Sequence, residues 1–345
     1  MLNVDLRSDT VTQPTPAMRQ AMAEAPVGDD VYGEDPTVNR LQAMAAELMG
    51  MQAGLFVASG TMGNLTAILS HCQRGHEVML GNKAHTFLFE AGGISALGGV
   101  HSCQLPNQAD GSLALEDIQT AIRPDDPHEP VSRLICLENT HNRCGGTYQS
   151  AEYMQQVVAY AHAHGLFVHL DGARIFNAAV AQKVTAKDLV AGADSVTFCI
   201  SKGLCAPVGS VLCGTNEFIA RASRYRKMLG GGMRQAGILA AAGIVSLETM
   251  IDRLNEDHAR ARRLAEGLRA IPGLVLELGM PTTNMVFVSL AAEVPLSSEQ
   301  VIQELNARGV RVGATSARQF RLVTHYWVDD AGVEKAIQAF SEVLQ

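Results

Sequence analysis

A lysine and an aspartate, each placed directly after an apolar run, are the residues of this chain best suited to chemistry. Lys202 follows the run 195 to 200, in CISKGLCAPVGS, where few charged residues surround it. Partial desolvation at such a position makes an amine a usable nucleophile. Asp171 follows the run 166 to 170, in HLDGAR, and a buried carboxylate needs a cation or several donors. Taken alone, each residue also has a purely structural interpretation. Lys202 could be a lysine that enters solvent at the end of a strand, and Asp171 could be an aspartate in a turn or at a helix N-cap.

A glycine-containing turn offers a place for an anion. The apolar run 55 to 58 is followed by Ser59, Gly60 and Thr61, and then by a helical stretch to about Cys72. A helix that begins there points free backbone N–H groups and the positive end of its dipole at the anion, with two hydroxyls as extra donors. Glycine lets the backbone approach closely. An ordinary capped helix start is the structural alternative.

Three further residues are candidates. His85, in KAHTFLFEAGG, could stack on a flat ligand or act as an acid or base. Arg234, in GGGMRQAG, could approach a phosphate. Arg321, in FRLVTH, could hold a carboxylate by two parallel hydrogen bonds. Their alternatives are a structural histidine, a mobile surface loop and a solvent-facing strand residue. His162 and His164 lie two apart on a helix and cannot share a face, so no metal site is predicted.

The lysine, the aspartate and the phosphate turn together match what pyridoxal phosphate (PLP) requires of a protein. Lys202 would carry the cofactor as a Schiff base. A carboxylate at Asp171 would keep the pyridinium nitrogen protonated, which lets the ring act as an electron sink. The pair is moderately specific because one strand-helix-strand unit separates the two residues.

The helices and strands expected around Asp171 and Lys202 predict that both side chains face the same crevice. A helix is expected over 151 to 164, capped by Gly165, and a strand over 166 to 170. A short helix announced by Thr185 and Asp188, at capping-box spacing, leads to a second strand over 195 to 200. Right-handed parallel crossovers put both carboxyl ends on the same edge of a sheet, where open α/β sheets bind ligands.

The pattern divides the chain into two α/β domains. Residues 1 to 252, including an N-terminal arm, are predicted to form a large domain around a mostly parallel central sheet. From about Arg253, a long charged helix, short strands and two further helices predict a smaller domain over 253 to 345.

Composition limits the class of protein. With 345 residues, 47% hydrophobic and 18% charged, the chain can bury a large core, and its net charge of −8 gives no general attraction to nucleic acid or an anionic membrane. Its first residues do not resemble a secretory signal, and no run is long and apolar enough to span a bilayer. Seven scattered cysteines without a CxxC pair favour reduced thiols, so we expect a cytoplasmic protein.

The order and content of the motifs resemble the low-specificity L-threonine aldolases, which are PLP enzymes of the aspartate-aminotransferase-like fold, fold type I. The resemblance covers the chain from end to end. It is carried by DLRSDTVT (5 to 12), VGDDVYGEDPTVN (27 to 39), SGTMGNL (59 to 65), AHTFLFEAGG (84 to 93), LENTHN (137 to 142), HLDGARIFNA (169 to 178), SKGLCAPVGS (201 to 210), RKMLGGGMRQAGILAAAG (226 to 243) and RLVTH (321 to 325).

The resemblance implies cleavage of L-threonine or L-allo-threonine to glycine and an aldehyde, and it assigns roles to particular residues. The cofactor ligands would be Ser59, Gly60, Thr61, His85 (stacked on the ring), Asp171, Arg174, Ser201 and Lys202, with Lys227 and Arg234 from a neighbouring subunit. The substrate ligands would be Ser8, His85, His128, Arg174 and Arg321, with Tyr32 from the partner. A homotetramer with active sites at dimer interfaces is expected.

Several points stay open at this level. The base that removes the substrate hydroxyl proton is His85, His128 or a water molecule. The sequence departs from the family where Arg143 to Gly146 replaces a common glycine-lysine pair, and where Glu129 and Pro130 follow His128, which affects the preference between threonine and allo-threonine. A β-eliminating lyase, a transaminase and a non-catalytic binding protein are the alternative functions.

Overall fold

The structure is a computed structural model that describes residues 3–344. Contacts divide it into a large unit, Pro14–Ile251, and a small unit that runs from Asp252 onward and also includes the chain up to Gln13. The domain boundary expected after residue 252 stays a prediction; by contacts, the N-terminal arm, which we expected in the large domain, is grouped with the small unit. There, β1 (Val4–Asp5) pairs in parallel with β11 (Val310–Arg311). A two-residue strand carries no periodicity, so the sequence pattern could not assign the arm.

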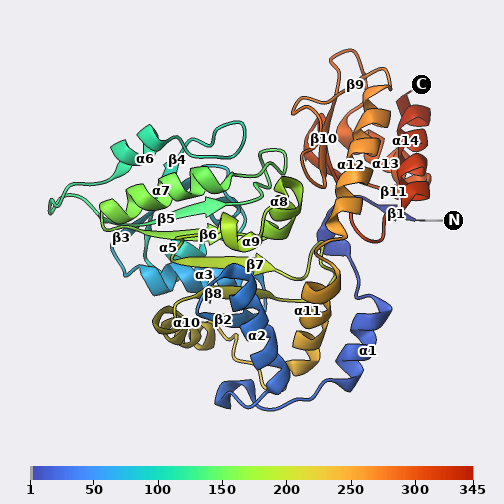
Figure 1. Cartoon of the computed structure of the whole chain (residues 1–345). Coiled ribbons are helices and arrows are strands. Elements are labelled where there is room, and N and C mark those ends of the chain that lie inside the picture. The colour runs from blue at the N-terminus through green and yellow to red at the C-terminus, as the bar shows by residue number, and fades with distance from the viewer. Residues whose placement is uncertain (1–2, 345) are drawn as a thin grey trace. The chain divides into compact units, whose positions relative to one another are not determined.

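A seven-stranded sheet forms the centre of the large unit, in the order β2-β8-β7-β6-β5-β3-β4 (Figure 1). Neighbouring strands are parallel except that β8 runs antiparallel to both β2 and β7. The predicted mostly parallel α/β sheet is therefore confirmed. The strands are β2 (Ala53–Val57), β3 (His76–Gly81), β4 (His101–Leu105), β5 (Val131–Glu138), β6 (Phe167–Asp171), β7 (Ser195–Cys199) and β8 (Ser210–Gly214).

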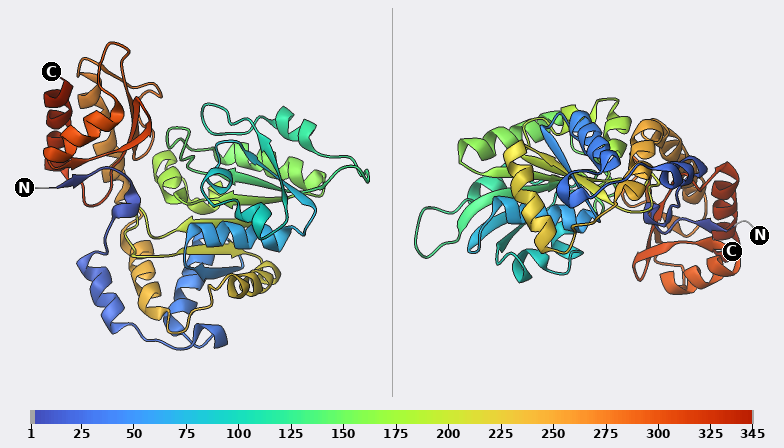
Figure 2. Two further views of the ribbon diagram at one scale, coloured as in Figure 1. Left: turned by 180° about the vertical axis from the view of Figure 1, so that it is seen from behind. Right: turned by 90° about the horizontal axis from the view of Figure 1, so that it is seen from below.

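Helices cover both faces of this sheet (Figures 1 and 2). On one face, Ala67 of α3 and Phe218 of α10 pack with Leu55 and Leu212. On the other, the rings of Phe176 in α8 and Phe198 in β7 meet edge to face with 5.3 Å between centroids. The helices of this unit are α1 (Pro16–Glu24), α2 (Pro36–Met49), α3 (Gly60–His71), α4 (His85–Leu88), α5 (Gly93–Ala96), α6 (Leu115–Ala121), α7 (Ala151–Ala163), α8 (Ile175–Gln182), α9 (Ala186–Leu189), α10 (Asn216–Met228) and α11 (Gly237–Thr249).

Helix α3 lies unusually close to the centre of the sheet. A Cβ atom placed on Gly63 would come within 2.5 Å of Thr197 Cγ2 in β7. Only glycine therefore allows the helix to approach the strand at this point. The close approach brings the polar residues of α3 against the carboxyl ends of β6 and β7, where the candidate site is formed.

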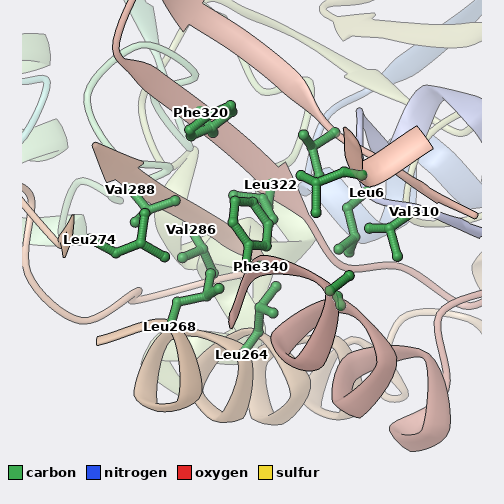
Figure 3. Packing of buried hydrophobic residues seen from close by; sticks show 14 of the residues in the cluster. Leu6, Leu264, Leu268, Leu274, Val286, Val288, Val310, Phe320, Leu322 and Phe340 are labelled. Carbon is green, nitrogen blue, oxygen red and sulfur yellow. The ribbon is translucent and has the colours of Figure 1, made fainter. Parts of the chain in front are cut away.

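The small unit is an antiparallel sheet covered by helices. Its sheet order is β12-β13-β10-β9, and Leu6 from the N-terminal arm is buried in its core beside Leu264, Leu322 and Phe340 (Figure 3). Burial of Leu6 explains why the arm folds with this unit. The elements are α12 (Leu254–Arg269), β9 (Leu274–Val275), β10 (Met285–Leu290), α13 (Ser298–Ala307), β12 (Gly313–Ser316), β13 (Gln319–Val323) and α14 (Asp330–Leu344).

Two short 3-10 helices complete the described chain, Asp9–Val11 in the small unit and Asp30–Tyr32 in the large unit. Within residues 3–344, no helix has both the length and the apolar character needed to cross a bilayer.

Candidate active site

The strands of the large unit that carry the chemistry end at one edge of its sheet. Asp171 is the last residue of β6, and its register partners are Glu138 at the end of β5 and Thr197 in β7. Lys202 follows β7 three positions after Cys199. The parallel β6–β7 pairing thus has the geometry that the sequence predicted, with the aspartate and the lysine leaving the sheet on the same side.

The predicted phosphate turn lies at the same edge. Ser59 caps α3, and its Oγ accepts a hydrogen bond from the backbone N–H of Met62 at 3.1 Å. At Gly60, an added Cβ atom would come within 2.9 Å of Cys199 Sγ. Because Gly60 has no side chain, the N-terminus of α3, which is the positive end of its dipole, can lie directly beside Cys199 at the end of β7. Lys202 follows Cys199 three positions later in the chain.

His85 begins α4 and connects the other polar groups. Its Nδ1 lies 3.0 Å from Glu90 Oε1, its backbone N–H donates to Glu138 Oε2 at 2.7 Å, and its side chain is 33% exposed. The hydrogen bond to Glu90 raises the pKa of His85, and the charge of Asp171 raises it further, whereas burial and the charge of Lys202 lower it. Both Asp171 and Lys202 therefore lie close enough to act on the same imidazole.

The carboxylate of Asp171 is buried and held by specific donors. Its Oδ1 accepts from the backbone N–H of Ala173 at 3.0 Å, and its Oδ2 accepts from Asn64 Nδ2 at 2.9 Å. Asn64 Nδ2 also donates to Glu90 Oε1 at 2.9 Å. Burial raises the pKa of Glu90, while its hydrogen bond with His85 lowers it.

Among the described residues, His85, Glu90 and Asp171 are also the one group that could hold a metal ion, because their candidate ligand atoms lie within 4.8 Å of one another. However, Glu90 Oε1 already pairs with His85 Nδ1, and the amide of Asn64 already donates to both carboxylates. An amide N–H group that donates to an oxygen of each carboxylate occupies the position a cation would take and opposes its binding there.

The arrangement as a whole fits PLP. It combines an amine, a buried carboxylate that can face a ring nitrogen, a partly exposed imidazole and the N-terminus of α3, all within one unit. Arg174, buried directly before α8, and Ser201, half-buried before Lys202, lie on the segments that leave the same edge.

Three predicted residues face solvent in the single chain. Tyr32 is 75% exposed, Lys227 near the end of α10 is exposed, and Arg234 pairs with Asp29 at 2.9 Å while its side chain stays 55% exposed. We predicted that these residues act on a neighbouring subunit, and that role stays a prediction.

Ser8 and Arg321 belong to the small unit. Ser8 Oγ accepts the backbone N–H of Thr10 at 3.2 Å, and Arg321 Nη2 donates to the backbone oxygen of Arg7 at 3.4 Å. The arm and β13 thus bring the two predicted carboxylate ligands near each other within that unit. Their contact with substrate stays a prediction.

His128 does not lie with this group of residues in the single chain, and its expected catalytic role stays a prediction. It lies before β5, at the opposite end of that strand from Glu138, and its side chain is 90% exposed and paired with Asp126. Glu138 lies seven positions after Val131 along β5, or about 23 Å away at about 3.3 Å per residue. The loop between α6 and β5 projects away from the sheet (Figure 1).

Sequence reasoning missed four polar residues of the site: Asn64, Glu90, Glu138 and His169. A signal was available for one of them, since His169 stands two residues before Asp171 and alternate strand residues share a face. The other three meet through strand register and the packing of α3, which no local pattern reveals.

Comparison with known proteins agrees with this geometry. The model of the beta-eliminating lyase family matches residues 5–293. "Probable low-specificity L-threonine aldolase 2" of Arabidopsis thaliana is 47% identical over 344 residues, which cover 99% of this chain and 97% of that protein. "Low specificity L-threonine aldolase" of Escherichia coli (strain K12) is 48% identical over 322 residues, 93% of each chain.

Solved structures show the same fold. A threonine aldolase of Leishmania major superposes with a TM-score of 0.84 at 21% identity, covering 99% of this chain and 100% of that one. A serine palmitoyltransferase described with a PLP internal aldimine superposes with a TM-score of 0.77 at 18% identity, covering 99% and 87%. At such identities the likeness concerns the fold alone, and it confirms the expected fold type I.

Proposed function

The chain belongs to the beta-eliminating lyase family and, within it, to the low-specificity L-threonine aldolases, and on that premise we propose that it is a PLP-dependent aldehyde lyase. It cleaves the Cα–Cβ bond of L-threonine, L-allo-threonine and related β-hydroxy-α-amino acids to glycine and an aldehyde. The observation that carries this proposal is geometric: Asp171 ends β6 and Lys202 follows the parallel neighbour β7, so both lie at the edge of the sheet where α3 and α4 begin.

The residues at this edge divide the work of holding the cofactor. When bound, PLP supplies an electron sink that stabilises the negative charge left at Cα. Lys202 would hold it covalently through Nζ, and Asp171 would keep a proton on its ring nitrogen. Its phosphate would be held by the N-terminus of α3 through Ser59, Gly60 and Thr61, and His85 would stack on its ring.

Orientation of the substrate is the task proposed for Arg174, Arg321 and Ser8. A guanidinium can hold a carboxylate by two parallel hydrogen bonds, which fixes the rotation about the bond to Cα. Such a fixed carboxylate would set the Cα–Cβ bond perpendicular to the cofactor ring. Orientation of this kind contributes on the order of 7–11 kcal/mol in favourable intramolecular reactions.

The proton of the substrate hydroxyl needs an acceptor, and His85 is the residue that we propose. Its Nδ1 is engaged by Glu90, so Nε2 is the atom that takes the proton. Glu90 makes the imidazole a stronger base, because its hydrogen bond raises the pKa of His85. In a single chain, the distance of His128 from the end of β5 leaves His85 as the histidine within reach.

We further propose a cytoplasmic homotetramer with active sites at dimer interfaces. The exposure of Tyr32, Lys227 and Arg234 in the isolated chain supports a role for them in a neighbouring subunit. All seven cysteines are free, which fits a reducing compartment.

A product assay tests the reaction. Purified protein supplied with PLP and either L-threonine or L-allo-threonine is expected to release acetaldehyde and glycine in equal amounts. A β-eliminating lyase would release ammonia and 2-oxobutanoate, a transaminase would require an oxo-acid acceptor, and a binding protein would give no product. Any of these three results in place of acetaldehyde and glycine contradicts the proposal.

A further inference from the structure

Four buried polar residues form a continuous series of hydrogen bonds that ends on Asp171. His71 Nε2 lies 2.8 Å from Ser195 Oγ, and Ser195 Oγ lies 2.8 Å from His169 Nδ1. His169 Nε2 lies 3.2 Å from Asn64 Oδ1, and Asn64 Nδ2 donates to Asp171 Oδ2 at 2.9 Å. We call these four residues the relay. They come from α3, β6 and β7, and none is more than 7% exposed.

Elementary donor and acceptor rules fix the direction of every bond. The amino group of Asn64 faces the Asp171 carboxylate, so its carbonyl oxygen must accept the N–H of His169 Nε2. With that proton on Nε2, His169 Nδ1 accepts the hydroxyl proton of Ser195, whose oxygen then accepts from His71 Nε2. All donors therefore point toward Asp171.

Both imidazoles are in the neutral form that this direction requires. Burial lowers the pKa of His71 to about 3 and that of His169 to about 4. Each ring then carries a single proton near neutral pH. The remaining nitrogen of His71, Nδ1, is buried without a hydrogen-bond partner among the described residues, so the series begins at this ring.

We propose that the relay positions the carboxylate of Asp171 and keeps it anionic, so that the ring nitrogen of the bound cofactor retains its proton. This inference rests on the proposed PLP-dependent function. A donor aimed at Asp171 Oδ2 stabilises the charged form of the carboxyl, and donors behind it polarise that bond further in a low-dielectric interior. The four members are positioning residues, because they act on the cofactor through other side chains: all four through Asp171, and Asn64 also through Glu90 and His85. Ser195→Ala and His71→Phe therefore test the series itself, since neither residue contacts Glu90.

Plain structural packing accounts less well for this series. Burial of a hydroxyl or an imidazole costs free energy unless the group is hydrogen-bonded. Apolar side chains at positions 195 and 71 would fill the same space without that cost. His71 already packs between the rings of Phe167 and Phe218, at centroid distances of 4.9 and 4.6 Å. An aromatic hydrocarbon at position 71 would meet the same packing need.

The test follows the cofactor nitrogen directly. Wild type and the variants Asn64→Leu, Ser195→Ala and His71→Phe are loaded with PLP labelled at its ring nitrogen, and nitrogen NMR reports whether that nitrogen is protonated. The dissociation constant for PLP is measured on the same proteins by titration of the apoprotein. Asn64→Leu is expected to weaken PLP binding by roughly 10- to 100-fold, the scale of losing a hydrogen bond to a buried charged group. Ser195→Ala and His71→Phe should have successively smaller effects, and the nitrogen signal should move toward the unprotonated form in the same order.

The matched control is Ser298→Ala in the small unit. Ser298 is also a buried serine, and its Oγ donates to a backbone oxygen at 2.8 Å, but it has no part in the relay. It should leave both the nitrogen signal and PLP affinity unchanged. His71→Phe keeps the ring packing, so at least one relay variant is expected to fold if Asn64→Leu does not.

The outcomes separate the two claims. Wild-type protein that binds PLP with a protonated ring nitrogen, together with Ser195→Ala and His71→Phe variants indistinguishable from it, overturns the relay alone. Wild-type protein that takes up no PLP overturns the proposed function and the relay with it.

Discussion

Replacement of Lys202 by alanine is expected to lower aldol cleavage of L-threonine by roughly 10⁴-fold or more, the scale of loss when a covalent catalytic group is removed. Lys202 is the amine that follows β7 at the sheet edge, next to the strand that ends in Asp171, and it is the group that we propose holds the cofactor covalently. Acetaldehyde release under saturating substrate and added PLP measures the effect.

The control for this substitution is Lys187→Ala. Lys187 is an exposed lysine on α9, where alanine suits the helix, so its variant should retain wild-type activity. Circular dichroism of the Lys202→Ala apoprotein should match wild type. Turnover within tenfold of wild type in Lys202→Ala would contradict the assignment of this lysine.

Replacement of Asp171 by asparagine is expected to lower turnover by roughly 10²- to 10⁴-fold, the range typical of losing a positioned proton-holding group. An amide at this position cannot stabilise a protonated ring nitrogen, and its own amino group would oppose the donor of Asn64 that now binds Oδ2. PLP affinity should fall as well. Steady-state assays and PLP titration of the apoprotein measure the two effects.

Asp188→Asn serves as the matched control, because Asp188 is a solvent-exposed carboxylate that closes the capping box of α9 with Thr185. Its variant should keep full activity with a small loss of thermal stability. If Asp171→Asn were as active as Asp188→Asn, Asp171 could not be the partner of the cofactor nitrogen.

Local sequence patterns located the elements of the large unit from α7 to β7 that flank Asp171 and Lys202. The expected helix over 151 to 164 is α7 (Ala151–Ala163), and the expected strands over 166 to 170 and 195 to 200 are β6 (Phe167–Asp171) and β7 (Ser195–Cys199). The capping box at Thr185 is formed as its spacing predicted. These elements were predictable because their apolar residues form clear runs or recur with helical spacing, and because glycine or capping residues mark where the helices begin or end. The two-residue strands β1 and β9 have neither, so they exist only through their pairing partners.

The candidate site was predictable only in part. Asp171, Gly60 and His85 each end or begin a regular element, so their types and places are visible in the sequence. The polar groups that support them meet across strands and helices far apart in the chain, as Asn64 meets Asp171 over 107 positions. The role of His128 rests on the resemblance alone and stays a prediction, since this residue lies in the exposed loop before β5.

Reduction of the PLP-loaded wild-type protein with borohydride, followed by mass mapping of its peptides, tests most directly whether this sheet edge binds the cofactor. The account predicts a stable phosphopyridoxyl group on Lys202, the lysine that follows β7 beside Asp171. A label on any other lysine, or bound PLP without any label, would contradict it.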